Sequence, residues 1–149
     1  MKDFMLLALE EAHLASQRNE IPVGAVIVDP RSNSVLASSG NRVIVDSDPT
    51  AHAEMVVIRK VASLYGVTKL IGLDLYVTLE PCPMCASAIG LSRLRKLFFG
   101  AYDSKTGGVD HGPRIFSHNT MHHKPEVMGG IREKESSKYL KEFFKLKRK

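Results

Sequence analysis

The pattern of apolar and polar positions predicts helices and strands that alternate along the chain. From residue 3 to about residue 18, apolar side chains recur at positions such as Met5, Leu9 and Ala15, as on one face of an amphipathic helix. Residues 23–28 form a short β-branched run that ends in the turn cluster DPRSNS. We expect this run to be a strand and the following VLASSG to pair back with it as a hairpin.

Local signals also delimit the central elements. Asp48 is a good helix cap and Pro49 suits a first helical turn, so a second helix is predicted to start at Pro49 and to stop at Gly66. Residues 74–79 are predicted to be a third strand. A third helix is predicted from Pro81 or Pro83 to about residue 91, followed by a fourth strand over residues 96–100.

The last third of the chain has fewer regular patterns. Residues 101–124 are predicted to be a loop with a short helical piece near PRIFS, EVMGG to be a fifth strand, and residues 131 to about 147 to be the last helix. The long connection between strands four and five suits a parallel crossover. The alternation of elements predicts an α/β protein with layers around one sheet, and no repeat or linker divides residues 1–149, which we expect to be one domain.

Composition and charge narrow the class of protein. The 149 residues are 44% hydrophobic and 25% charged, and no apolar run approaches the ~18 residues of a membrane span. Glu10 and Glu11 follow the apolar N-terminal stretch, so we expect a helix there and no signal peptide. The net charge of +5 is concentrated in residues 138–149, which hold six basic groups and one acid. This end of the chain is either a footprint for a polyanion or a solvated tail.

The segment LEPCPMC holds the two cysteines of the chain, Cys82 and Cys85. This CxxC spacing at a predicted helix start allows a metal half-site, a redox pair or two buried small side chains. Together with the lack of an export signal, the spacing favours a reducing cytosol and a metal or redox role over a structural disulfide.

The segment PTAHAEM makes a metal site the favoured interpretation. His52 would supply a third ligand beside Cys82 and Cys85, which leaves the fourth tetrahedral position open, as in catalytic zinc sites. Zinc at such a site lowers the pKa of a water molecule, and Glu54 could carry that water's proton to a substrate. A fourth protein ligand would instead make a closed, structural site, for which the candidates are the late histidines His111, His118, His122 and His123.

The chain resembles a known family at this point. H-A-E followed by P-C-x-x-C is the signature of the zinc-dependent nucleoside and nucleobase deaminases. The resemblance is to the bacterial tRNA-specific adenosine deaminases, and it covers nearly the whole chain through EIPVGAVIV, GNR, DPTAHAE, LYVTLEPCPMCASAI, FGAYDSKTGG and FFKLKRK. It implies a three-layer α/β/α sandwich with a central mixed five-stranded sheet, and a cytoplasmic homodimer with one Zn²⁺ per subunit. The implied reaction is hydrolysis of the wobble adenosine of a tRNA anticodon to inosine with release of ammonia.

The resemblance also implies roles for individual residues. His52, Cys82 and Cys85 match the zinc ligands, and Glu54 matches the proton shuttle. The matches to substrate-binding positions are Asn41 and Ala53 near the target base, Asp103 and Lys105 in a loop against the anticodon, and Phe143, Phe144 and Arg148 at the end of the last helix. The structural alternatives are turn formation by Asn41 and Asp103, and core packing by at least one of the two phenylalanines.

Two other functions compete with RNA editing. A deaminase of free cytosine, guanine or a nucleoside would share the signature, although it would not need the basic C-terminal end. A zinc-stabilised binding module would need a closed site. The segment VDHGPRIFSHNTMHH departs from the family because Gly112, Pro113 and extra histidines replace a Gly-Ser-Leu-Met-like helix, so the resemblance does not predict the contacts of residues 109–123.

Overall fold

A computed structural model describes residues 2–147 of the chain. Its elements follow in the order α1 (Phe4–Gln17), β1 (Gly24–Asp29), β2 (Ser34–Gly40), α2 (Ala53–Tyr65), β3 (Asp74–Leu79), α3 (Pro83–Leu91), β4 (Lys96–Ala101), the short 3₁₀ helix η1 (Ile115–Ser117), β5 (Glu126–Met128) and α4 (Glu133–Lys147). This order confirms the predicted alternation of helices and strands. Each helix within residues 2–147 is too short or too polar to span a lipid bilayer.

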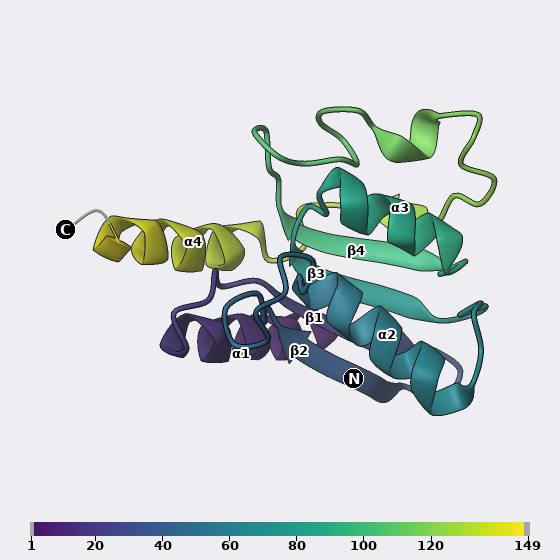
Figure 1. Cartoon of the computed structure of the whole chain (residues 1–149), viewed down its shortest axis with the longest axis horizontal. Helices are drawn as coiled ribbons and strands as arrows, with labels where there is room; N and C mark the ends of the chain where they lie inside the picture. The colour runs from purple at the N-terminus through teal and green to yellow at the C-terminus, as the bar shows by residue number, and fades with distance from the viewer. Residues whose placement is uncertain (1, 148–149) are drawn as a thin grey trace.

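The five strands form one mixed sheet in the order β2-β1-β3-β4-β5. β1 pairs antiparallel with both β2 and β3, whereas β3–β4 and β4–β5 are parallel. The predicted hairpin and the predicted parallel crossover to the fifth strand are therefore both confirmed. Helices α2 and α3 lie on one face of this sheet, and α1 lies on the other with α4 beside it (Figure 1).

The alternation of side chains along the strands explains the three layers. Ile27 and Leu75 point to one face and pack in the main core with Val57 of α2. Val26 points to the opposite face, where it packs with Met5 of α1. α1 lies very close to β1, since a Cβ added to Gly24 would lie 1.9 Å from the Ala8 carbonyl oxygen. The structure is thus the α/β/α sandwich with a mixed five-stranded sheet that the resemblance implies.

The predicted start of the second helix is wrong. α2 begins at Ala53 with His52 as its N-cap, rather than at Pro49 with Asp48 as the cap. Asp48 Oδ1 instead accepts hydrogen bonds from the N–H and hydroxyl groups of Thr50 and so closes a turn. The predicted end is confirmed, because Gly66 adopts the left-handed conformation (φ 62°) that ends many helices.

Candidate metal centre and active site

Three side chains from two helix starts converge in one group. His52 is the N-cap of α2, Cys82 is the N-cap of α3, and Cys85 lies in the first turn of α3. The side chains of His52 and Cys82 make no capping hydrogen bond to their own helix, so both point toward the space between the two helix starts. The sulfur atoms of Cys82 and Cys85 lie 3.6 Å and 3.5 Å from His52 Nδ1.

These separations fit a zinc ion. Tetrahedral coordination with typical Zn–N and Zn–S bond lengths places the nitrogen and sulfur atoms about 3.6 Å apart. All three ligand atoms lie within 4.8 Å of one another, and within residues 2–147 no other set of three or more His, Cys, Asp or Glu side chains meets that criterion. One imidazole and two thiols also form a donor set that zinc prefers.

The electrostatics of the three groups favour a cation. A hydrogen bond from the Cys85 thiol, with a contribution from His52, lowers the pKa of Cys82 to about 4. The same hydrogen bond, together with burial, raises the pKa of Cys85. The hydrogen bond with Cys82 raises the pKa of His52. The three groups therefore share protons, and a divalent cation displaces these protons when it binds.

Glu54 lies two residues beyond His52 and does not belong to the ligand group. It is 4% exposed in the first turn of α2. Burial raises the pKa of Glu54 to about 7. A carboxyl group with a pKa near neutrality can both accept and donate a proton at physiological pH, so the arrangement suits general acid–base chemistry beside a metal ion.

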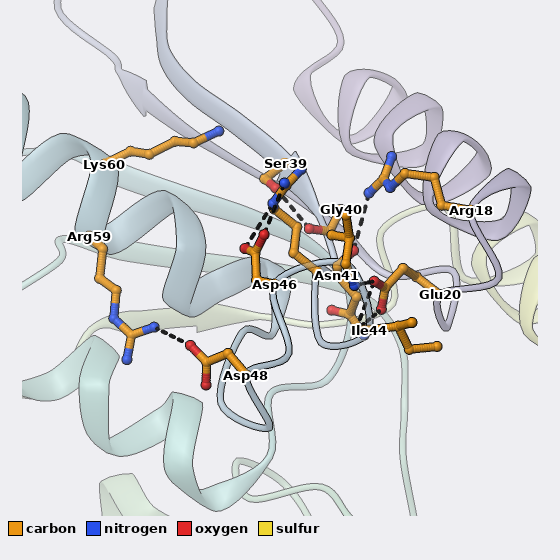
Figure 2. Close-up of polar contacts among 12 residues, drawn as sticks. Arg18, Glu20, Ser39, Gly40, Asn41, Ile44, Asp46, Asp48, Arg59 and Lys60 are labelled. Atoms are coloured by element: carbon orange, nitrogen blue, oxygen red, sulfur yellow. Dashed lines mark hydrogen bonds and ion pairs between the residues drawn. The ribbon is translucent and has the colours of Figure 1, made fainter.

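Asn41 links the end of β2 to this group. Its Oδ1 accepts a 2.8 Å hydrogen bond from the N–H of Ala53. Its carbonyl oxygen accepts one from Arg18 (Figure 2). Ala53 is fully buried between His52 and Glu54. Asn41 Nδ2 donates to no residue in the described part of the chain, which leaves that amide group available to a ligand. Asn41 and Ala53 thus lie beside the metal centre, and their contact with a target base stays a prediction.

The other predicted contact residues lie in two places. Asp103 accepts hydrogen bonds from the N–H groups of Lys105 and Thr106 and so shapes a turn that leaves Lys105 exposed. Phe144 of α4 is 43% exposed and Phe143 is half-buried, and neither belongs to the hydrophobic core. The alternative that one of them packs in the core is therefore wrong. Arg148 lies outside the described residues.

The late histidines do not complete the ligand group. His111 Nδ1 lies 2.8 Å from Glu80 Oε1, and His118 and His123 contact the carbonyl oxygens of Pro113 and Leu94. None of the three is in the group formed with Cys82 and Cys85, and His122 is not in it either. The described part of the chain therefore supplies three ligands rather than a closed set of four.

Sequence reasoning missed two buried glutamates that hold loops. Glu20 is 1% exposed and accepts hydrogen bonds from the N–H groups of Ile44 and Val45, in the loop after Asn41 (Figure 2). Glu80 is 2% exposed and holds the loop that follows β4. The sequence offers one signal for each of them, an acidic residue next to a run of apolar residues. Such a pattern indicates that the acid is buried, but it does not identify the groups that bind the carboxylate.

Comparison with known proteins gives consistent results. The sequence model of the cytidine and deoxycytidylate deaminase zinc-binding region matches residues 1–101. The chain is 51% identical over 145 residues to a tRNA-specific adenosine deaminase of Agrobacterium fabrum, which covers 97% of this chain and 94% of that protein. A solved structure from a study of adenosine-to-inosine editing by tRNA deaminases at the wobble position superposes with a TM-score of 0.89 at 51% identity, and covers 92% of this chain and 98% of that one.

A guanine deaminase is also similar over part of the chain. The structure of the Bacillus subtilis enzyme shares 36% identity with a TM-score of 0.64. That match covers 68% of this chain and 66% of the other. It is less extensive than the similarity to the tRNA deaminases.

Proposed function

The chain belongs to the tRNA-specific adenosine deaminases of the cytidine and deoxycytidylate deaminase family, and we propose that it converts the wobble adenosine of a tRNA anticodon to inosine. The observation that carries this proposal is the group of His52, Cys82 and Cys85 beside the buried carboxyl group of Glu54. Three ligands and an adjacent proton carrier are what a hydrolytic zinc deaminase needs. The similarity to tRNA deaminases over nearly the whole chain supports an RNA-borne adenosine as the substrate.

The proposed reaction balances with one water molecule. Zn²⁺ held by the three ligands supplies the Lewis acidity that makes water a nucleophile near neutral pH. Glu54 accepts a proton from the attacking water and delivers it to the ring nitrogen next to the amino-bearing carbon. Glu54 then transfers the second proton to the amino group, which leaves as ammonia. Water thus supplies the new carbonyl oxygen, a proton that stays on the ring and a proton that leaves with ammonia.

The side chains around the centre suggest how the target base is held. We propose that Asn41 donates from its free Nδ2 to the base, since its Oδ1 is already bound to the N–H of Ala53. Ala53 would act mainly by fixing Asn41, because its own N–H is engaged and it is fully buried. A base must leave its stack to reach this centre, and an anticodon loop lowers the cost because its bases are not held in a duplex.

The remaining RNA contacts are proposed from exposure and charge. Lys105 lies exposed on a turn fixed by Asp103, and Phe144 offers an exposed aromatic face. The last turn of α4 carries Lys145 and Lys147, and Arg148 follows it in the sequence. Cations would bind phosphates and the ring would stack on an unpaired base, as in other proteins that bind single strands.

We also propose the assembly and setting of the enzyme. Residues 1–149 would act as a single deaminase domain, since the described elements pack on one sheet. A homodimer is supported by the family and by large exposed apolar side chains on the α2–α3 side, where Leu64 is 70% and Leu91 is 75% exposed. Sedimentation of a monomer at micromolar concentration would contradict the dimer. The cytoplasm is the proposed location because the CxxC thiols must stay reduced to bind metal.

Ammonia release by the zinc-loaded protein tests the proposed substrate. The substrates to compare are an adenosine-bearing anticodon stem-loop, free cytosine, guanine and adenine, and their nucleosides. The proposal predicts turnover of the stem-loop alone. Turnover of a free base alone would support the second candidate, a nucleobase deaminase, which the partial similarity to guanine deaminase favours. The metal centre would then be retained and the role of the basic C-terminal end in RNA binding would be refuted.

A further inference from the structure

Glu80 is a buried carboxyl group without a role in the chemistry described above. It directly follows β3 and precedes Pro81 and the ligand Cys82. Its own N–H donates to the Ala101 carbonyl oxygen and so continues the pairing of β3 with β4, a contact that any residue other than proline could make. The side chain itself is fully buried. The fold of β3 therefore does not explain why an acid stands at this position.

The carboxylate is surrounded by donors from one loop. Oε1 accepts from the N–H of Asp103 at 3.0 Å and lies 2.8 Å from His111 Nδ1. Oε2 accepts from three consecutive N–H groups, those of Val109 at 3.2 Å, Asp110 at 3.0 Å and His111 at 3.1 Å. Both ends of the segment 103–111 are thus attached to a single side chain.

These contacts suit a carboxylate. Four backbone N–H groups converge on its two oxygens, and an ionised carboxylate only accepts hydrogen bonds. Backbone N–H groups that converge in this way form an anion-binding nest, here filled by a side chain of the same protein. Without the carboxylate, these N–H groups would lose their acceptor in a partly buried place.

The same loop lies directly against the metal-binding segment. The N–H of Gly108 donates to the Pro81 carbonyl oxygen at 2.8 Å. A Cβ added to Gly108 would lie 2.6 Å from Pro83 N and 2.8 Å from the carbonyl carbon of Cys82. The loop backbone therefore forms one wall beside the metal ligand Cys82, with no room for a side chain between them.

We propose that Glu80 is the positioning residue that fixes residues 103–111 as this wall and so sets how tightly the substrate RNA is held. Glu80 fixes the backbone of Asp103, whose own carboxylate shapes the turn that presents Lys105. The role for RNA rests on the function proposed above, whereas the attachment of the loop by Glu80 does not.

The proposal predicts a specific kinetic pattern. Within the described residues the side chain of Glu80 makes no hydrogen bond to Glu54 or to the three ligands, so its loss should leave zinc binding and kcat largely intact. A mobile wall would instead weaken RNA binding and raise KM. A general loss of folding would instead lower kcat, kcat/KM and zinc content together.

The test uses two variants and a matched control. Glu80→Gln places an amide donor among N–H donors, and His111→Ala removes the side-chain partner of Glu80 while the buried carboxylate stays. His122→Ala is the control, because His122 is an exposed histidine of the neighbouring segment. For each variant we would measure zinc content, kcat and KM on the anticodon stem-loop, and the hydrogen exchange of amides 103–111 in the absence of RNA.

We expect amides 103 and 109–111 to exchange faster in both variants. We expect KM for the stem-loop to rise about tenfold in Glu80→Gln and less in His111→Ala. RNA would then have to order a loop that Glu80 otherwise holds, and the loss of one hydrogen bond to a charged group changes such an equilibrium by roughly one to two powers of ten. Zinc content should stay at the parental level, and His122→Ala should match the parent throughout. Unchanged exchange, or a fall in kcat with parental KM, would overturn the proposal. If Glu80→Gln does not fold, His111→Ala alone decides between these outcomes.

The two proposals fail in different ways. A parent protein that does not deaminate the stem-loop would refute the proposed function, while the exchange experiment would still test whether Glu80 attaches the loop. An active parent whose His111→Ala variant keeps parental exchange and parental KM would refute the positioning role alone.

Discussion

Replacement of Glu54 by Gln separates proton transfer from metal binding. The side chain is 4% exposed, and it lies beside the ligand group without belonging to it. Gln has nearly the same volume and keeps a polar end, so the surrounding packing should remain. It cannot carry a proton, however, and this is the one property that the proposed mechanism requires of Glu54.

The size of the effect follows from the proposed role. General acid–base catalysis contributes about 10² to 10⁴ in rate, which corresponds to roughly 3–5 kcal/mol of activation free energy. Because Glu54 would transfer both protons, we expect the loss of kcat to lie at the upper end of that range. We expect the variant to be at least as stable as the parent, since burial opposes the charged form of Glu54 and Gln is neutral.

The assay compares kcat for inosine formation in an anticodon stem-loop with zinc content and KM. Zinc content and KM should stay at parental values, because the three ligands and the RNA-facing residues are untouched. Glu10→Gln is the matched control, since Glu10 is an exposed glutamate of α1 and should leave all three quantities unchanged. Parental kcat in Glu54→Gln would refute the proton-transfer role, and loss of zinc would show that Glu54 helps to hold the metal.

Three further predictions concern RNA binding, folding and the metal. Replacing Lys141, Lys145 and Lys147 together by Ala should weaken RNA binding. It should also reduce the slope of log affinity against log salt concentration by about 2, since each phosphate contact on a single strand contributes roughly 0.7. An unchanged slope measured by fluorescence anisotropy would contradict phosphate binding by α4. Asp74→Ala should lower the free energy of unfolding by about 1–3 kcal/mol, because Asp74 is buried and accepts two hydrogen bonds from Arg95 at 2.7 Å and 2.9 Å; an unchanged Tm would show that this pair contributes nothing. Chelation of zinc should abolish deamination and lower Tm, and zinc but not Mg²⁺ should restore both; activity that survives chelation would refute a metal-dependent reaction.

The elements that the sequence predicted correctly have strong local signals. The third strand was predicted at 74–79 and is observed as Asp74–Leu79, a run of apolar and β-branched residues bounded by an acid and a proline-rich segment. The metal ligands were also predictable, because the spacing of Cys82 and Cys85 fixes their direction from one helix start. His52 then completes a set of three ligands, one imidazole and two thiols, that is typical of catalytic zinc sites. Such features depend on residues that are neighbours along the chain or on fixed spacings.

The error at the start of α2 shows the limit of local signals. An Asp followed by Pro is typical both of a helix start and of a turn, and the two differ in which N–H groups donate to the Asp carboxylate. In this chain the N–H of Thr50 donates to Asp48, and the helix begins only at Ala53. The delay matters for the site, because it makes His52 the N-cap and so directs its side chain off the helix end toward the cysteines.

Glu20 and Glu80 show what sequence patterns do not contain. Glu20 binds a loop more than 20 residues away, and Glu80 binds residues 23 to 31 positions away. No periodicity or spacing links an acid to backbone N–H groups at such distances, since any residue other than proline can donate them. The walls of the site therefore became visible only in the folded chain, whereas its ligands could be read from the sequence.

The most direct test of the proposed deamination is to follow heavy oxygen from labelled water into an anticodon stem-loop. The zinc-loaded protein would convert the stem-loop in that water, and mass spectrometry of nuclease fragments would locate the label. We predict inosine with one labelled oxygen at the wobble position and nowhere else, and a conversion by Glu54→Gln that is slower by about 10⁴-fold. Label at other adenosines would contradict selection of the wobble position. Absence of label and of inosine from the stem-loop, with a zinc-loaded and folded protein, would contradict the assignment as a hydrolytic tRNA adenosine deaminase.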